Sequence, residues 1–495
     1  MTVSRSIPVV DLFAGPGGLG EGFSGEISGE HPFRIAISVE KDPVAHRTLT
    51  LRAFVRIFTR HDRQIPEEYY GYLAGKISRQ VLEEKYPAEW KAAYKEALCA
   101  ELGNPKSGHQ PEIDKRIGEA LRGSRDWVLI GGPPCQAYSL VGRSRMLGAL
   151  KDKSGKLVDG GKAFFKDHRH KLYRQYLRII ALHGPAVFVM ENVKGILSSK
   201  LDEKKIFPQI LEDLRNPSAA AKQYDWANAK QCKYRIVSFV TGKEPRAGRE
   251  NEFLIRAEKH GIPQARHRVI LLGIREDVFD KIDGRISPLA SETGPNIDSI
   301  IYMMPRLRSG FSKGPDSVGR WRAYFKHLGS ESWVKDLDPE IQADLKNALT
   351  VLGKEELCRK YIGGGRFPVE KMDGWYADEQ LNVLPNHSTR ADMDSDLARY
   401  LFVATYGMTE GRSPHLVDFP AELRPNHKNI QNDDDPEDQK FSDRFKVQLW
   451  DGPASTITSH ISKDGHYFIH PDPTQCRSLT VREAARLQTF PDNYF

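Results

Sequence analysis

Short apolar runs recur along the chain, and most of them end at glycine, proline or a carboxylate. They lie at residues 7–13 (IPVVDLF), 33–39 (FRIAISV), 127–130 (WVLI), 186–190 (AVFVM), 235–240 and 269–273. Brief runs of β-branched and aliphatic residues between turn signals are typical of buried strands. Helical stretches follow several of these runs, so the pattern predicts an α/β fold with a doubly wound, mostly parallel sheet.

A glycine-rich turn follows the first run. Gly15, Gly17 and Gly20 satisfy the G-x-G-x-x-G spacing, in which glycine lets the backbone approach a ligand closely. The second run leads into Glu40, twenty positions after Gly20, where a carboxylate can accept both hydroxyls of a ribose. These residues alone fit NAD and S-adenosylmethionine equally well.

A cysteine, Cys135, lies on the loop GGPPCQAYS (residues 131–139) that follows the run at 127–130. Open α/β sheets carry their reactive groups at the carboxyl ends of strands, and two preceding prolines restrict the backbone of this loop. An isolated cysteine is more often a small buried apolar residue. The position of Cys135 favours a nucleophile held at the end of a strand.

Composition sets wider limits. A chain of 495 residues exceeds one ordinary core and indicates two domains, or one large domain with insertions. The 73 basic and 66 acidic residues leave a net charge of +7, which permits a polyanionic partner without requiring one. Five widely spaced cysteines argue against a zinc knuckle and a disulfide framework. Without a signal peptide or a membrane-spanning run, we expect a cytoplasmic protein with no membrane partner.

Six motifs in a fixed order extend these observations. They are DLFAGPGGLGEGF (11–23), PPCQ (133–136), D-x-R-x-x-L (167–172), ENV (191–193), Q-x-R-x-R (264–268), and PASTIT (453–458) together with RSLTVREAARLQTFPDNY (477–494). In wording and order they resemble the DNA (cytosine-5) methyltransferases of bacterial restriction-modification systems. The resemblance implies an S-adenosylmethionine-dependent methyltransferase fold with a smaller target-recognition domain, and it favours that cofactor over NAD.

The resemblance also implies how the cofactor is held. The expected cofactor-binding residues are Asp11, Phe13, Gly15, Gly17, Gly18, Glu40, Asp114, Pro134 and Leu172. Phe13 is expected to stack near the adenine, the glycines to line the methionine moiety, and Glu40 to hold the ribose. Asp114, 21 positions before Cys135, is expected to accept from the adenine amino group, and Leu172 to pack on the cofactor.

The expected catalytic residues are Cys135, Glu191, Arg266 and Arg268. Cytosine C5 is a poor nucleophile, so the resemblance implies attack of the Cys135 thiolate on C6 of a base removed from the stack. Glu191 is then expected to donate to N3 of the cytosine or to protonate it. Arg266 is expected to face O2 as a charged donor, while Arg268 pairs with acids or phosphates. The resulting enamine takes the methyl group at C5, and loss of the C5 proton releases the cysteine.

The motifs predict the domain organisation. Residues 1–275 form the catalytic and cofactor-binding domain, with a helical insertion at about 53–125. Residues 276–449 form the target-recognition domain, in which residues 302–327 mix basic and aromatic side chains suited to phosphates and bases. Residues 450–495 form a ninth-motif segment that returns toward the catalytic domain. In that segment, Thr480 and Glu483 predict a capping box.

The expected partner is double-stranded DNA, methylated by a monomer. A cognate restriction endonuclease that acts on the same site without direct contact is a further candidate. Three alternatives remain open: an RNA cytosine-5 methyltransferase, an NAD oxidoreductase, and a DNA-binding relative impaired in catalysis. The last arises because no tenth motif follows the ninth in the sequence. We therefore expect weak binding of S-adenosylmethionine by the chain alone, and favour truncation as the cause.

Overall fold

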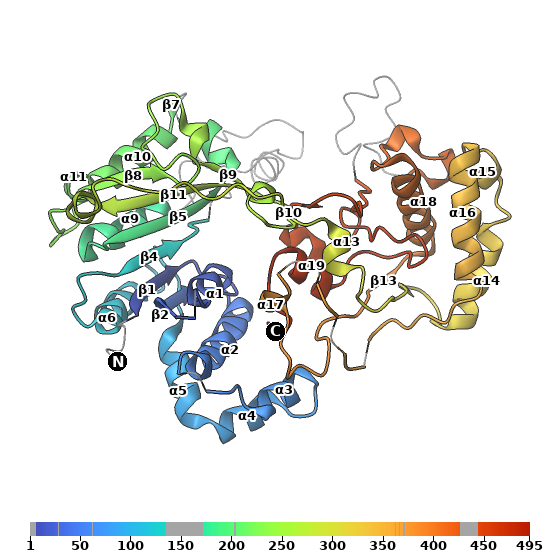
Figure 1. The fold of residues 1–495 in the computed structure, drawn as a ribbon, viewed down its shortest axis with the longest axis horizontal. Helices are drawn as coiled ribbons and strands as arrows, with labels where there is room; N and C mark the ends of the chain where they lie inside the picture. Colours follow the sequence, from blue (N-terminus) through green and yellow to red (C-terminus); the bar gives the residue numbers. More distant parts are fainter. Residues whose placement is uncertain are drawn as a thin grey trace. The chain divides into compact units, whose positions relative to one another are not determined.

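The computed structural model describes residues 6–27, 29–61, 63–134, 172–201, 204–361, 363–365, 367–369, 372–425 and 444–495 (Figure 1). Contacts divide the chain into two compact units. Unit 1 comprises residues 1–72, 77–256 and 267–290, and unit 2 comprises residues 73–76, 257–266 and 291–495. Within the described ranges, no helix is both long and apolar enough to cross a membrane.

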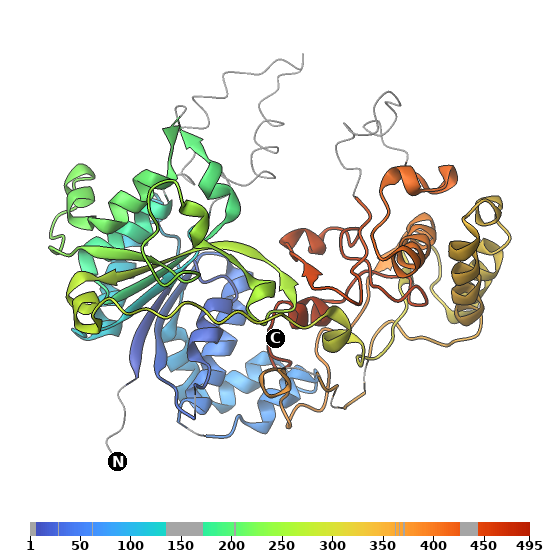
Figure 2. The same ribbon diagram turned by 45° about the horizontal axis from the view of Figure 1, so that its top comes forward.

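Unit 1 is built on an eight-stranded sheet of order β3-β2-β1-β4-β5-β11-β8, with β9 paired to β11 (Figures 1 and 2). The strands are β1 (Ile7–Leu12), β2 (Phe33–Glu40), β3 (Ala97–Cys99), β4 (Val128–Gly131), β5 (Val187–Val193), β8 (Tyr234–Ser238), β9 (Leu254–Arg256) and β11 (His267–Arg275). The first five run parallel, whereas β11 runs antiparallel to its three neighbours. The predicted mostly parallel α/β sheet is confirmed.

Alternation along the strands explains why helices cover both faces of the sheet. In β1, Val10 and Leu12 belong to one hydrophobic core and Val9 to another. The first core is covered by α6 (Gln110–Leu121), α9 (Leu172–His183), α10 (Phe207–Arg215) and α11 (Pro217–Gln223). Side chains of α1 (Gly18–Ser24) and α12 (Glu276–Phe279) pack against the second core. The result is a three-layered unit whose sheet is buried on both sides.

Part of the predicted helical insertion, about residues 53–125, belongs to the sheet of unit 1 and its covering layer. It contains β3, the edge strand beside β2, and α6, which packs on β2. Between α2 (Pro43–Thr59) and β3 lie α3 (Glu67–Leu73), α4 (Arg79–Lys85) and α5 (Pro87–Glu96). Phe54 of α2 stacks on Trp90 of α5 at a ring-centroid distance of 4.8 Å. Since β3 has three residues, its apolar pattern is too short to be detected in the sequence.

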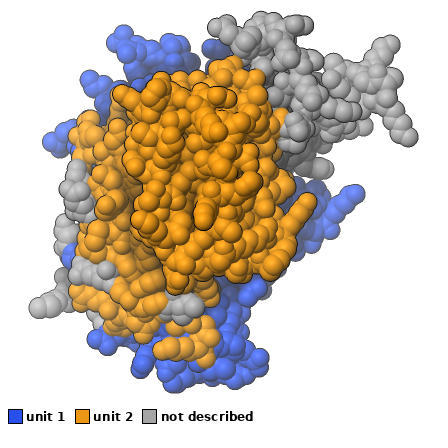
Figure 3. Space-filling view, turned by 90° about the vertical axis from the view of Figure 1, so that its right-hand side faces the viewer, with its two compact units in different colours: residues 1–72, 77–256, 267–290 blue, residues 73–76, 257–266, 291–495 orange. Residues whose placement is uncertain are grey.

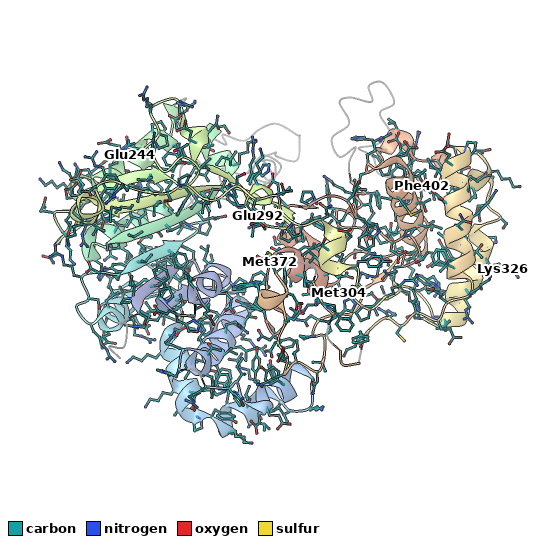
Figure 4. The ribbon with its side chains drawn as sticks, in the orientation of Figure 1. Glu244, Glu292, Met304, Lys326, Met372 and Phe402 are labelled. Atoms are coloured by element: carbon teal, nitrogen blue, oxygen red, sulfur yellow. The ribbon has the colours of Figure 1, made fainter. Side chains whose placement is uncertain are left out.

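Unit 2, orange in Figure 3, consists of helices joined by long irregular segments. Its helices are α13 (Ile297–Ile301), α14 (Val318–Leu328), α15 (Ser332–Lys335), α16 (Pro339–Leu352), α17 (Asp373–Tyr376), α18 (Asp394–Glu410) and α19 (Val481–Leu487). Two short parallel pairs join β10 (Gln264–Ala265) to β14 (Ala454–Ser455) and β12 (Gly310–Phe311) to β13 (Ala391–Asp392). The larger core lies among α14, α16 and α18 and includes Phe402 (Figure 4). The smaller core joins α13 and α19.

The packing boundaries differ from the expected domain limits. Residues 276–290 remain with unit 1, whereas residues 450–495 pack within unit 2. Contacts of β10 join residues 257–266 to the last segment of the chain. The Gln264 amide donates to Leu487 O at 3.0 Å, and β10 pairs with β14. The capping box is confirmed, since Glu483 N donates to Thr480 Oγ1 at 3.2 Å and Thr480 N donates to Glu483 Oε2 at 2.7 Å.

Residues 302–327 do not form the exposed basic and aromatic surface that their composition suggested. Phe311, Trp321 and Phe325 are buried in the larger core of unit 2. The arginines pair with acids: Arg306 with Glu355 and Asp472, Arg308 with Asp316, Arg320 with Asp394, and Arg322 with Glu356. Lys326 is exposed on α14 (Figure 4). In α14, which covers the second half of this stretch, the mixture reflects a helix with one apolar and one charged face.

Candidate active site

The carboxyl ends of the parallel strands meet at one edge of the sheet in unit 1. There β1 leads into residues 13–17, β2 ends at Glu40, β4 leads into residues 132–134, and β5 carries Glu191 near its end. The order of the strands reverses between β1 and β4. Open α/β sheets bind ligands in the crevice outside such a switch point. This edge is the candidate site.

Positive backbone angles shape the loop after β1. The φ angle is +57° at Gly15 and +103° at Gly17, values that favour glycine, and Phe13 also has a φ of +58°. Gly15 N donates to Glu40 Oε2 at 2.7 Å, and Asp42 N donates to Glu40 Oε1 at 2.8 Å. These bonds hold the Glu40 carboxylate against the loop.

This arrangement fits the nucleoside of S-adenosylmethionine. A carboxylate has about four lone-pair sites, so Glu40 can accept from both hydroxyls of a ribose in addition to its two backbone donors. A Cβ added to Gly15 would meet no atom within 4 Å, so the loop surface beside Glu40 is open. Gly18 follows as the first residue of α1.

Asp11 lies beneath the same loop and is fully buried. A Cβ added to Gly20 of α1 would be 3.2 Å from Asp11 Oδ2, and neither carboxylate oxygen accepts a hydrogen bond from the described residues. Burial raises the pKa of Asp11 to about 7, with the charge of Arg56 opposing the rise and that of Glu40 adding to it. The Asp11 carboxylate is thus removed from water, and its expected role at the cofactor stays a prediction.

Asp114, expected at the adenine, is engaged elsewhere. It lies on α6, and its carboxylate accepts two hydrogen bonds from the Arg178 guanidinium of α9, at 2.9 and 2.7 Å. Glu101 follows the end of β3, the strand beside β2, and its neighbour Ala100 N donates to Glu40 O at 2.9 Å. A hydrogen bond from Asn104 lowers the pKa of Glu101, so this carboxylate is ionised at neutral pH. No sequence pattern indicates Glu101, because the three residues of β3 are too few to form a detectable apolar run.

The nucleophile loop is described as far as Pro134. Cys135 and all residues to 171, including most of the D-x-R-x-x-L motif, lie outside the described residues. Asn192 of β5 donates from Nδ2 to Pro133 O at 3.4 Å and thereby ties the loop to the neighbouring strand. Leu172 is the first residue of α9 and is half-buried.

Glu191 and Arg268 form an ion pair at this edge. Glu191 Oε1 and Arg268 Nε are 2.7 Å apart, and the two side chains are 24% and 17% exposed respectively. The register of the sheet brings them together, since β11 runs antiparallel to β5 with Arg268 opposite Val193. A guanidinium beside a carboxylate, both partly removed from water, presents a carboxyl group and charged donors side by side.

Arg266 has different surroundings. It belongs to a segment of unit 2, where its Nη1 donates to Ile457 O at 3.4 Å. The Glu191–Arg268 pair lies within unit 1. The expectation that Arg268 pairs with an acid is met by this ion pair. The roles of the two arginines at the target base stay predictions.

The sequence matches the C-5 cytosine-specific DNA methylase family over residues 80–230 and 388–495, together more than half of the chain. A type II methyltransferase of Bacillus paralicheniformis, M.Bpa9945I, is 32% identical over 500 aligned residues, covering 98% of this chain and 91% of that protein. The chain belongs to this methylase family. A DNA (cytosine-5-)-methyltransferase of Aeropyrum pernix, M.ApeKI, is 33% identical over 74% of each chain. A solved structure from Escherichia coli, described as a putative DNA modification methyltransferase encoded within a prophage, covers 99% of this chain at 16% identity, with a TM-score of 0.42.

The methylase match includes the nucleophile loop and the Glu191 strand, but it begins after the glycine loop. The interpretation of Gly15 and Glu40 therefore depends on the geometry described above. Sequence reasoning missed Asn192 as the tie to the nucleophile loop, although it lies within the ENV motif. It also missed that the Glu191 carboxylate lies beside Gly132, where an added Cβ would be 2.8 Å from Glu191 Oε2. The two residues are far apart in the chain, so no local pattern links them.

Proposed function

We propose that this methylase transfers a methyl group from S-adenosylmethionine to C5 of a cytosine flipped out of a specific double-stranded DNA sequence, within a restriction-modification system. The observation that carries the proposal is the Glu191–Arg268 pair, 2.7 Å apart, at the strand edge where β4 delivers the nucleophile loop. A cognate endonuclease acts on the same DNA sequence without contacting the methylase, which works as a monomer.

The cofactor supplies an electrophilic methyl group when bound. Glu40 holds the ribose hydroxyls while the Gly15 N–H fixes one of its oxygens. Phe13 and Gly17 shape the loop around the adenosine and methionine parts through their positive φ angles. We assign the adenine contact to Glu101 in place of Asp114, because the carboxylate of Asp114 is committed to Arg178.

The target base is activated by residues from three strands. The thiolate of Cys135 adds to C6 and forms a carbon–sulfur bond, which makes C5 nucleophilic. Glu191 acts at N3, and Arg268 donates to O2, so the charge that develops on the ring is stabilised by fixed partners. After methyl transfer, loss of the C5 proton and cleavage of the carbon–sulfur bond restore the thiolate and the aromatic ring.

Substitution of the nucleophile tests this proposal. The Cys135→Ala variant should lose methyl transfer while retaining DNA binding, because phosphate contacts supply most of the affinity for DNA. DNA containing 5-fluorocytosine should trap a covalent complex with the wild-type chain and not with the variant. Transfer of labelled methyl to RNA in preference to DNA would show that RNA, and not DNA, is the substrate. Substantial transfer by Cys135→Ala would disprove the mechanism.

A further inference from the structure

Two consecutive glycines, Gly131 and Gly132, open the nucleophile loop and have different surroundings. A Cβ added to Gly131 would be 2.4 Å from the backbone oxygen of Leu12 in β1. Glycine at 131 is therefore required by the close passage of two strands. A Cβ added to Gly132 would instead be 2.8 Å from Glu191 Oε2, and the next atoms of Glu191 are 3.8 Å away.

The backbone itself does not require glycine at position 132. Gly132 is absent from the described glycines with a positive φ, so its conformation is one that alanine adopts without strain. The obstacle to a larger residue is the side-chain carboxylate of Glu191. Contacts below 3.0 Å force one group to move, so the freedom of that carboxylate decides the outcome.

Glu191 has little freedom to move. Its Oε1 is held 2.7 Å from Arg268 Nε, and its backbone pairs with Ile270 of β11. On the other side, β5 is joined to β4 through the pairing of Met190 with Gly131. The carboxylate thus lies between the Arg268 guanidinium and the start of the nucleophile loop, so a side chain at 132 would push it out of its place beside Arg268.

We propose that Gly132 is a positioning residue for Glu191. Its missing side chain lets the Glu191 carboxylate lie against the start of the nucleophile loop while it remains paired with Arg268. A side chain at 132 displaces the carboxylate by roughly half an ångström, which is the tolerance of a catalytic arrangement. The inference rests on the proposed role of Glu191 at cytosine N3.

The Gly132→Ala variant tests it. We expect kcat to fall by about 10- to 100-fold, because a small misplacement of a catalytic group is enough for such a loss. The KM for DNA and the Kd of S-adenosylmethionine, measured by calorimetry, should stay at their wild-type values. The matched control is Gly118→Ala on α6, where an added Cβ meets nothing within 4 Å and activity should be retained.

A double-mutant cycle separates positioning from general damage. Glu191→Asp withdraws the carboxylate from position 132, so its effect should be smaller in the Gly132→Ala background than in the wild type. Independent, additive losses would overturn the inference, as would loss of cofactor binding by Gly132→Ala. If Gly132→Ala turns over normally while Glu191→Gln is inactive, the inference fails and the proposed function stands. Full activity of Glu191→Gln would instead remove the role assigned to Glu191.

Discussion

Arg266 and Arg268, separated by one residue, have distinct chemical surroundings in this methylase. Arg268 forms an ion pair with Glu191, whereas the Arg266 guanidinium donates to the backbone at Ile457. Motif spacing predicts that both arginines precede a strand, but it does not say which of them reaches the acid. That depends on the register of β11 against β5, which the sequence does not contain.

Exchanging each arginine for lysine should separate their roles. Arg268→Lys should lower kcat by about 100-fold, because lysine lacks the planar fork of donors and a fixed charged donor is worth about that much. Arg266→Lys should retain most of the turnover and lose stability instead. Single-turnover methyl transfer and thermal unfolding of both variants provide the measurements. An equal or opposite ranking of the two rates would restore Arg266 as the donor to the base.

The carboxylates near the cofactor loop allow a second comparison. Glu40→Gln should weaken S-adenosylmethionine binding by about 10-fold or more, since hydrogen bonds to a charged group contribute about 1.5–3 kcal/mol. Asp114→Asn should leave the affinity unchanged and reduce stability by at most about 1 kcal/mol, because its pair with Arg178 is partly exposed. Calorimetric titration with the cofactor measures both. A large loss of affinity in Asp114→Asn alone would show that Asp114 contacts the adenine.

At the scale of elements, strands that lead into a motif are easier to predict from the sequence than the helices that surround them. Apolar runs followed by glycine or a carboxylate identify β1, β2, β4 and β5, because a buried strand has a strong local pattern. β3 and the small strand pairs of unit 2 are too short to carry one. The mixture of basic and aromatic residues at 302–327 predicts a DNA surface, yet in α14 the aromatic side chains Trp321 and Phe325 are buried in the core of unit 2.

His470 and Glu483, the latter in α19, show how tertiary contacts determine pKa values. His470 is fully buried, and burial, assisted by the charge of Arg477, lowers its pKa to about 3, with Glu483 opposing. Burial alone would raise the pKa of Glu483, but Arg477 holds it well below the usual range through charge and hydrogen bonds. Both groups therefore bind fewer protons in the folded chain than in the unfolded chain at acidic pH.

Stability should consequently fall as the pH drops below about 6.5, where His470 is protonated only in the unfolded chain. Between pH 7 and pH 5 the expected contribution of His470 is about 2 kcal/mol. His470→Gln should flatten this dependence, whereas His327→Gln, at a side chain 76% exposed, should leave it unchanged. Denaturant unfolding at several pH values gives the slopes. A slope that is the same in wild type and His470→Gln would show that other groups set the acid sensitivity.

At the scale of the whole molecule, the order of motifs predicts two functional parts, and the compact units of the structure have other boundaries than these parts. The expected limits at 275 and 449 follow the end of one motif and the start of another. Packing instead assigns residues 257–266 and 450–495 to unit 2. The difference arises because the smaller core of unit 2 combines Ile297 and Ile300 with Ala454, Ile457 and Leu487, residues more than 150 positions apart. Such a core has no signature in a local sequence window.

This division leads to a prediction about sequence specificity. Base-edge recognition requires side chains on a module other than the cofactor fold, and we expect unit 2 to be that module. A hybrid that takes residues 276–449 into a relative of different specificity would separate the buried Arg486 from Ile300 O and Phe367 O, to which it donates at 3.1 and 2.9 Å. Arg486 would keep its pair with Asp492, at 2.6 Å, but lose both backbone acceptors. We expect that hybrid to be less stable than the parent, because each buried polar group left without a partner costs about 1–3 kcal/mol.

A second hybrid carries residues 257–266 and 291–495 together. It retains the hydrogen bonds of Arg486, the bond from Gln264 to Leu487 O and the β10–β14 pair. We expect it to fold with an unfolding midpoint close to that of the parent and to methylate the DNA sequence of the unit 2 donor. Thermal unfolding distinguishes the two hybrids, and bisulfite sequencing of the product identifies the methylated site. Equal stability of both hybrids would show that residues 450–495 fold independently of α13. An active second hybrid that retains the site of its host would place recognition outside unit 2.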